Sequence, residues 1–379
     1  MHEDEAFAGQ IGIGDATCPT CGESSLRVLD TREPRNFYTD GVALDYNGFF
    51  ELQTRGTRPS LAVSQEGDPS LVGNALVQGS VKEILTFNDA HGKGGFSFVP
   101  DHRVGPGAYR ALEGGGLGAP QSRRVALLAR RMTDAMQVGV CRWPANHGAS
   151  PETVEGRAAW YSLSFALRIA AGAMLDIEPT EIESGLYVAP GRNGAEARAF
   201  MADRLENGAG YASLLSKPPV FEKLLEAFES RTLRVWRHHS EECDSSCAKC
   251  LRDYTNLAYH PILDWRLAAD MVALLRDGTK PLDFKGSHWA DLAVARDSGI
   301  EKSLDQLGYR RIEVEAGLPT FAFETKAKTD VVIMRHPLWT DDHPELVAAR
   351  QTARELFGHT TNTRVLSPFL LLRRPSEAL

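Results

Sequence analysis

The chain has 379 residues, a formal net charge of −8 at pH 7, 42% hydrophobic residues and 24% charged residues. This length and balance predict a globular protein with room for two domains and a sizeable buried core. The acidic excess excludes a surface that binds nucleic acid over its whole extent, so any such contact needs a local basic patch.

The N-terminal residues do not resemble a signal peptide, because an acidic and then Gly-rich stretch replaces the apolar segment. The longest apolar run, Trp160–Leu175, contains Arg168 and is shorter than the roughly 20 residues that cross a bilayer. We therefore expect a cytoplasmic protein without membrane contact. In that reducing compartment, the six Cys are expected to be metal ligands or buried thiols rather than disulfides.

In the first half of the chain, strands are expected at Val81–Phe87 and Gly95–Val99 around a turn. The periodicity then predicts a helix over Arg123–Gln137, with apolar residues on one face. Four arginines fall on its opposite face: Arg123, Arg124, Arg130 and Arg131. That face could neutralise a nucleic-acid backbone, or it could be an ordinary solvated helix face.

A mostly buried helix is predicted over Pro151–Leu175, with Ser150 as its cap. Further along, the patterns predict two short strands (Leu186–Ala189, Ala199–Asp203) and two amphipathic helices (Val220–Phe228, Asp264–Arg276). After a break at Gly278–Gly286, they predict a helix, a strand pair, a buried strand, a second helix and a last strand. The bounds expected for the last five are Arg311–Glu315, Thr320–Glu324, Asp330–Met334, Pro344–Phe357 and Arg364–Leu372.

These elements predict an α+β fold, in which a mixed β-meander and helix domain stabilised by zinc precedes a small C-terminal α/β unit. The expected domains are residues 1–26, a half zinc knuckle; 27–280, the main zinc-binding domain; and 285–379, the C-terminal unit.

The strongest chemical signal is the cluster Cys243-x3-Cys247-x2-Cys250. Thiolates at such spacing, in a short turn, suit the tetrahedral coordination of Zn²⁺. A closed structural site needs a fourth ligand. We favour His260, and leave His238, His239 and Cys141 as alternatives.

A second Cys pair, Cys18-x2-Cys21, precedes Gly22 and looks like half of a zinc ribbon. No further pair follows within the next hundred residues, so a metal-free knuckle is an equal alternative.

Several segments together resemble the MrfA zinc-binding domain family, a helicase-associated domain of unknown function. The similarity rests on Ala199-Phe-Met-Ala-Asp203, Glu206-Asn-Gly-Ala-Gly-Tyr211, the Cys cluster, Leu251-Arg-Asp-Tyr254 with Asn256, and His260 with Leu263-Asp264. Weaker matches lie upstream, around Glu33–Asp40 and Phe87–Gly92. Together these segments cover roughly residues 30 to 275.

The resemblance implies a zinc-bearing accessory domain that works beside a DEAD/DEAH-box helicase motor on DNA, in cis or in trans. Such domains occur in MrfA-type helicases and in DrmB of the DISARM phage-defence systems, so it implies a role in DNA repair or phage defence. The chain has no G-x-x-x-x-G-K-[ST] motif, and we expect it not to hydrolyse ATP by itself.

Two further segments suggest other chemistry. The turn after Asp203, with Gly208 and Gly210, could expose backbone N–H groups to an anion, or its glycines could simply permit tight packing. Glu324-x-Lys326 at a strand end, with Asp291 and Glu313 as partners, would suit a metal-dependent nuclease. A nuclease and a protein scaffold without DNA contact are the alternative functions.

Overall fold

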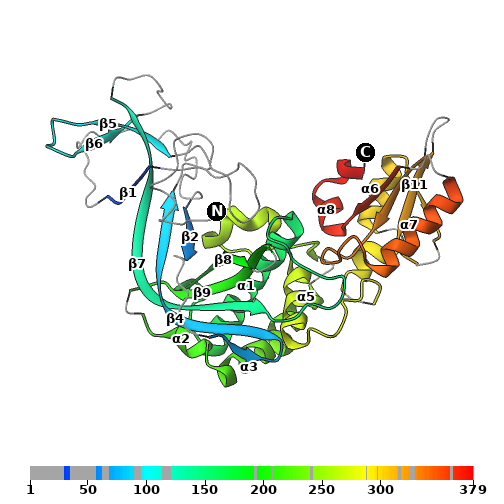
Figure 1. Ribbon diagram of the computed structural model, residues 1–379, viewed down its shortest axis with the longest axis horizontal. Coiled ribbons are helices and arrows are strands. Elements are labelled where there is room, and N and C mark those ends of the chain that lie inside the picture. Colours follow the sequence, from blue (N-terminus) through cyan, green and yellow to red (C-terminus); the bar gives the residue numbers. More distant parts are fainter. Residues whose placement is uncertain are drawn as a thin grey trace.

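The computed structural model describes residues 30–34, 57–61, 68–88, 95–112, 121–191, 194–206, 208–239, 242–286, 288–296, 298–314, 317–324, 329–358 and 362–378. It contains one large sheet, a group of helices packed beneath it, and a smaller sheet near the C-terminus (Figure 1). The α+β class predicted from the sequence is confirmed.

The large sheet is built around β7, an 18-residue strand. Its main path runs β2-β4-β7-β5-β6, and β9 also pairs with β7 while β8 pairs with β9. The strands of this sheet are β1 (Thr31–Arg32), β2 (Thr57–Leu61), β3 (Ser70–Val72), β4 (Ala75–Asn88), β5 (Phe96–Pro100), β6 (Tyr109–Ala111), β7 (Arg123–Val140), β8 (Ile182–Gly191) and β9 (Gly194–Asp203).

The helix predicted over Arg123–Gln137 is wrong, because these residues form most of β7. Their Arg, Ala, Leu and Met side chains favour helix locally. However, β4 pairs antiparallel with β7 from Leu127 to Val140, and these long-range hydrogen bonds override that preference. Met132, expected on the buried helical face, is 54% exposed.

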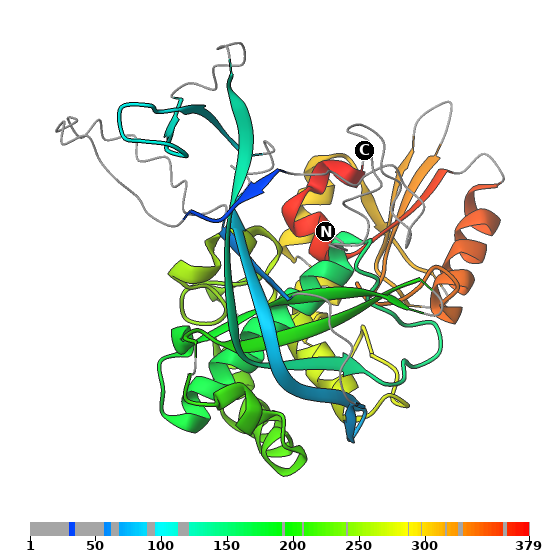
Figure 2. The same cartoon turned by 60° about the vertical axis from the view of Figure 1, so that its left-hand side comes forward.

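The inner end of β7 is covered on both faces, which hides the alternation expected of a strand. Met136 and Val138 point into the main core, whereas Ala135 packs with a smaller cluster that includes Phe200. The outer end of β7 leaves the body together with β4 and carries β5 and β6 at its tip (Figure 2). We call this projection, formed by residues 82–88, 95–112 and 121–131, the arm.

The main helices pack beneath the sheet, and α1 is the longest of them, with most of its residues buried. Its apolar composition and length would suffice to cross a membrane, but 72% of its most apolar window is buried by the rest of the protein. Thr153 rather than Ser150 caps it, accepting the Gly156 N–H at 3.0 Å. These helices are α1 (Val154–Leu175), α2 (Tyr211–Leu215), α3 (Pro218–Ala227), α4 (Leu233–His238) and α5 (Trp265–Arg276), with the 3-10 helix η6 (Tyr254–Ile262) before α5.

The C-terminal sheet has the order β10-β11-β12-β13, with its last two strands parallel and joined through α7. In Figure 1, α7 lies on one side of this sheet and α6 and α8 on the other. The elements are α6 (Gly299–Gln306), β10 (Arg310–Ile312), β11 (Thr320–Glu324), β12 (Thr329–Met334), α7 (Pro344–Phe357), β13 (Asn362–Leu366) and α8 (Pro368–Arg373).

The last predicted strand, Arg364–Leu372, is wrong in its second half. Pro368 has no N–H to donate to a neighbouring strand, and Ser367 caps α8 by accepting the Leu370 N–H at 3.3 Å.

The core runs without a break across the boundary expected between residues 280 and 285. Leu282 and Phe284 are buried in this connecting segment. The bridge between His147 and Trp339 joins the C-terminal unit to the main body. Whether each part folds independently is not tested by this packing, so the three-domain division stays a prediction.

Candidate metal centre

Four metal-ligating side chains converge just after α4: His239, Cys243, Cys247 and Cys250. Their ligand atoms all lie within 4.8 Å of one another. The Sγ atom of Cys250 lies 4.0 Å from that of Cys243 and 3.8 Å from that of Cys247. Tetrahedral Zn²⁺ with Zn–S bonds of about 2.3 Å separates its sulfurs by roughly 3.8 Å, whereas a disulfide bond is about 2.05 Å long. The spacing therefore fits a metal site.

The imidazole of His239 is arranged to offer one nitrogen. Its Nδ1 lies 3.4 Å from the Val235 carbonyl oxygen, one turn back along the helix. Its Nε2 is buried and makes no hydrogen bond to the protein. Metal-bound histidines commonly donate one ring N–H to a carbonyl in this way, which leaves the other nitrogen free to coordinate.

Backbone N–H groups support the sulfurs. The Cys247 N–H donates to Cys250 Sγ at 3.1 Å, and the Lys249 N–H donates to Cys247 Sγ at 3.3 Å. Such hydrogen bonds favour thiolates, which are the forms that bind metal. The ammonium of Lys249 also pairs with Glu242 at 2.6 Å, closing the turn from outside.

Without metal, the thiols share protons. A hydrogen bond from Cys250 lowers the pKa of Cys243 to about 5, although burial opposes the shift. The same hydrogen bond raises the pKa of Cys250, and burial acts in the same direction. A divalent cation would replace the shared proton and hold the sulfurs as thiolates.

The cluster is anchored to the first turn of α5. The Trp265 N–H donates to the Ser245 carbonyl at 2.9 Å, and the Arg266 guanidinium donates to the Asp244 carbonyl at 2.6 Å. The side chain of Asp264 caps α5 by accepting the Arg266 N–H. The segment that would hold the metal is thus tied to a core helix.

The fourth member of the cluster is His239, and the expectation for His260 is corrected. The Nε2 atom of His260 lies 2.8 Å from Asn256 Oδ1 and 3.0 Å from the Asp253 carbonyl oxygen, so it stabilises η6 instead. A spacing argument could have found His239, because it lies only four residues before Cys243 in the sequence. The sequence separation from the Cys cluster did not by itself distinguish His239 from His260 as the ligand.

The other proposed ligands lie elsewhere. His238 is exposed, with its Nδ1 2.7 Å from the Arg234 carbonyl oxygen. Cys141 is an exposed free thiol and does not belong to the group. Cys18 and Cys21 lie outside the described residues, so a metal at the half knuckle stays a prediction.

The four arginines predicted to form one patch are separated by the strand geometry. Arg131 pairs with Glu183 of β8, and Arg130 lies 4.0 Å from Glu83 of β4. Arg123 and Arg124 lie near the tip of the arm, where β7 pairs with β5. The common helical face does not exist, and DNA binding by these arginines stays a prediction.

The turn after Asp203 already contains an anion, which is the carboxylate of Asp203. It accepts the N–H groups of Gly210 at 2.7 Å, Tyr211 at 3.1 Å and Ala212 at 2.8 Å. Gly210 has a φ of +76°, and a Cβ at Gly208 would lie 2.8 Å from the Asp203 side chain. The glycines therefore serve packing, the structural alternative given above.

Glu313 and Glu324, two of the residues proposed for a nuclease, lie apart on the C-terminal sheet. The residue before Glu313 pairs with Thr320, whereas Glu324 lies four residues, about 13 Å, further along β11. Glu313 instead pairs with Arg296 at the surface. Lys326 lies outside the described residues.

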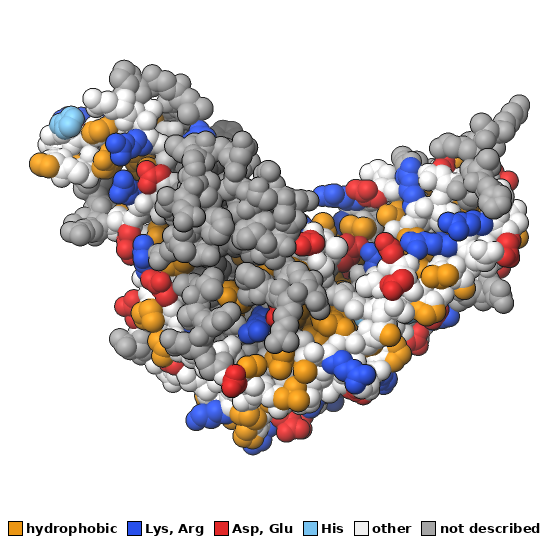
Figure 3. Space-filling model, in the orientation of Figure 1, with side chains coloured by type: hydrophobic (Ala, Val, Ile, Leu, Met, Phe, Trp, Pro, Cys, Tyr) orange, Lys and Arg blue, Asp and Glu red, His pale blue; other side chains and the backbone are white. Residues whose placement is uncertain are grey.

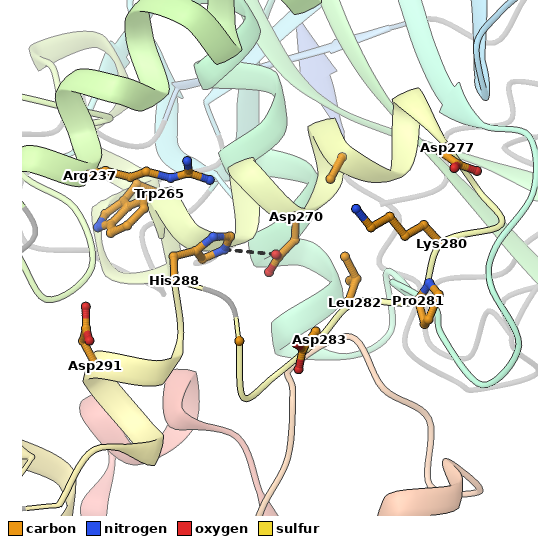
Figure 4. A pocket seen from close by; sticks show the side chains of 12 residues that line it. Arg237, Trp265, Asp270, Asp277, Lys280, Pro281, Leu282, Asp283, His288 and Asp291 are labelled. Carbon is orange, nitrogen blue, oxygen red and sulfur yellow. Dashed lines mark ion pairs between the residues drawn. The ribbon is translucent and has the colours of Figure 1, made fainter.

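A second polar cluster, which the sequence did not predict, surrounds Asp270 of α5 at the junction with the C-terminal unit. One carboxylate oxygen pairs with His288 Nε2 at 3.0 Å, as Figure 4 shows. The other accepts Trp289 Nε1 at 2.8 Å and pairs with His336 Nε2 at 3.0 Å. Burial alone would raise the pKa of Asp270, but the two histidines lower it.

A cavity of about 610 Å³ lies beside this cluster (Figure 4). Its lining includes the carboxylates of Asp277, Asp283 and Asp291 and the cations of Arg237 and Lys280. In the part of the chain that the structure describes, the group with converging ligand atoms is the one at His239, not this cavity.

No protein-family model matches the chain. Over 156 residues it is 29% identical to the Druantia protein DruE of Escherichia coli (strain UMEA 4076-1), a match that covers 40% of this chain and 8% of that protein. The chain is therefore related to a small part of a much longer protein.

Among solved structures, the crystal structure of the DUF1998 helicase MrfA bound to DNA matches 58% of this chain and 25% of its own chain. The identity is 12% and the TM-score is 0.35, which is too low to establish a shared fold. Neither match extends far enough to assign the chain to a family.

Proposed function

We propose that this chain is a zinc-stabilised accessory domain or subunit of a superfamily-two DNA helicase assembly, acting in phage defence or DNA repair. In this proposal His239, Cys243, Cys247 and Cys250 hold one structural Zn²⁺. The observation that carries it is the convergence of four ligand atoms within 4.8 Å, with the buried Nε2 of His239 making no hydrogen bond.

The donor set favours a structural ion over a catalytic one. Three sulfurs and one imidazole complete a tetrahedral shell, whereas a catalytic zinc keeps one position for water or substrate. The ion would fasten α4 to η6 and α5, because the Cys-bearing segment lies between these elements and is hydrogen-bonded to Trp265.

The helicase part of the proposal rests on the resemblance of the Asp203–Tyr211 stretch and the Cys cluster to helicase-associated zinc domains, and on the sequence similarity to DruE. The motor would be supplied by another chain or by another part of a longer protein. Since the sequence lacks a P-loop, the chain itself would contribute structure and contacts rather than ATP hydrolysis.

Elemental analysis of the purified chain tests the metal. We expect one zinc per chain, which Cys247→Ser removes and Cys141→Ser retains, because Cys141 lies outside the cluster. Absence of zinc from the wild-type protein, with all thiols freely titratable, would contradict the metal site.

The partner needs a separate test. The chain should co-purify with the helicase motor encoded beside its gene and should change that motor's DNA-dependent ATPase rate. ATP turnover by the isolated chain that survives repurification, or a motor indifferent to the chain, would count against the accessory role.

A further inference from the structure

The tip of the arm is a small three-stranded sheet carried away from the body. It consists of β5, β6 and the first residues of β7, with Phe98 of β5 paired to both Arg123 of β7 and Ala111 of β6. The ion pair of Arg131 with Glu183 holds the base of the arm against β8. Eight residues of strand separate Arg131 from Arg123, a distance of about 26 Å.

The tip is basic in a chain that is acidic overall. Its described residues, 95–112 and 121–126, contain four arginines and one aspartate, a formal charge of +3, whereas the whole chain carries −8. The aspartate, Asp101, is paired with Arg103 at 3.1 Å. Arg110, Arg123 and Arg124 are exposed.

Aromatic side chains are interleaved with these charges. Strand alternation places Phe96, Phe98 and Tyr109 on the face that also carries Arg123. Tyr109 is 46% exposed, and the rings of Phe96 and Phe98 meet edge to face with their centroids 6.5 Å apart. Figure 3 shows hydrophobic and basic side chains side by side on the projecting end of the molecule.

We propose that the arm tip binds single-stranded nucleic acid, with Tyr109 and Phe98 as stacking surfaces for bases and Arg123, on the same face, as a contact for phosphate. Exposed rings combined with cations are the chemistry by which proteins bind single strands without sequence preference. A duplex keeps its bases stacked on one another and offers these rings nothing to stack on. The evidence for this binding surface is the residues of the tip alone, and only the preference for DNA over RNA rests on the proposed function.

Binding of labelled oligo-dT, oligo-U and a duplex to the full-length chain, measured by fluorescence anisotropy against salt, tests the proposal. Each phosphate neutralised on a single strand contributes about 0.7 to the slope of log affinity against log salt. Arg123→Gln should therefore flatten the slope by about 0.7 and weaken binding. The control Arg310→Gln makes the same change of charge on the C-terminal unit and should leave the slope unchanged.

The ring is tested separately. Tyr109→Ala should weaken binding of single strands about tenfold, whereas Tyr109→Phe should retain it, because stacking needs the ring and not the hydroxyl. Melting curves confirm that each variant folds. Stronger binding to oligo-dT than to oligo-U supports DNA as the ligand, and the reverse preference supports the surface but rejects DNA.

Three outcomes would overturn the proposal. In the first two, neither oligonucleotide binds the chain, or the tip variants bind oligonucleotides as well as the control variant does. In the third, the tip is a site for acidic peptides instead, so the tip variants lose affinity for a poly-Glu peptide but keep their affinity for the oligonucleotides. Zinc content and motor binding are measured on the same preparations. A chain that keeps both but ignores single strands would reject the tip without rejecting the accessory role.

Discussion

In the part of the chain that the structure describes, the metal-ligating cluster at His239 contrasts with the titratable cluster at Asp270 in the hydrogen bonds that its polar atoms already make. In the cluster at His239, three sulfurs and one ring nitrogen face one another, and that nitrogen makes no hydrogen bond. Around Asp270, both carboxylate oxygens are already paired with His288, Trp289 and His336. The first cluster therefore has ligand atoms available to coordinate an ion, whereas the polar atoms of the second are already hydrogen-bonded to the protein.

The histidine protons at the junction support this distinction. His336 Nδ1 accepts the Leu338 N–H at 3.1 Å, so its Nε2 carries the proton directed at Asp270. His147 Nε2 accepts the Leu282 N–H at 3.1 Å, leaving its Nδ1 to donate to the Ala145 carbonyl. These neutral rings join the main body to the C-terminal unit by hydrogen bonds, which is a structural role.

The largest loss of stability is expected when the metal site is removed. Cys247→Ser, or removal of zinc by a chelator, should unfold the segment 242–265, because a structural zinc contributes on the order of 10 kcal/mol to the folding of its site. Hydrogen exchange should rise there while β12 near the junction stays protected. Equal protection with and without metal would show that the cluster needs no ion.

A smaller loss of stability is expected when the hydrogen bonds of Asp270 at the junction with the C-terminal unit are removed. Asp270→Asn puts an NH₂ group where the carboxylate now accepts hydrogen bonds, so it should cost about 2–4 kcal/mol of unfolding free energy. Asp277→Asn, at an exposed position just after the C-terminal end of the same helix, should cost less than about 1 kcal/mol. Urea unfolding measures both, and zinc content should be unchanged in both. Loss of zinc in Asp270→Asn would show that the two sites are coupled.

Acid should weaken the junction in a defined pH window. Burial lowers the pKa of His343 to about 4, and burial also lowers that of His336. Since the unfolded chain takes up these protons first, stability should fall as pH drops from about 6.5 towards 4, by on the order of 1–2 kcal/mol for His343 after allowance for solvent screening. The depressed pKa of Asp270 adds a further loss only below about pH 4.

His343→Phe isolates that contribution, because it keeps a ring stacked on Trp339, 3.6 Å away between centroids, and removes a buried Nδ1 that has no hydrogen bond. It should flatten the dependence between pH 6.5 and 4. A profile unchanged from wild type would assign the acid sensitivity to other groups, such as His336 and Cys243, whose pKa values are also lowered.

A comparison of His260→Ala with His239→Ala identifies the fourth ligand, and the first of these variants is expected to change stability least. His260→Ala should cost about 1 kcal/mol, since it removes hydrogen bonds to Asn256 and the Asp253 carbonyl, and should retain zinc. His239→Ala should lose zinc or bind it far more weakly. The reverse pattern would restore His260 as the ligand.

The local patterns predicted some elements correctly. The helix over Pro344–Phe357 and the buried strand ending at Met334 appear where the pattern placed them, because the helix packs one apolar face and the strand is a continuous apolar run buried on both faces. The Cys cluster was also readable from the sequence, since its three thiols lie within eight residues and a tight turn brings them together.

Local sequence was enough for three features: the turn that gathers Cys243, Cys247 and Cys250, the starts of α1 and α5 to within a few residues, and the absence of a P-loop. Tertiary structure decided that Arg123–Val140 is a strand, because its partner β4 lies some fifty residues away and supplies hydrogen bonds that no local propensity encodes. It also chose His239 over His260 and assembled Asp270 with His336, since helix orientation and chain return bring these side chains together across separations that spacing cannot resolve.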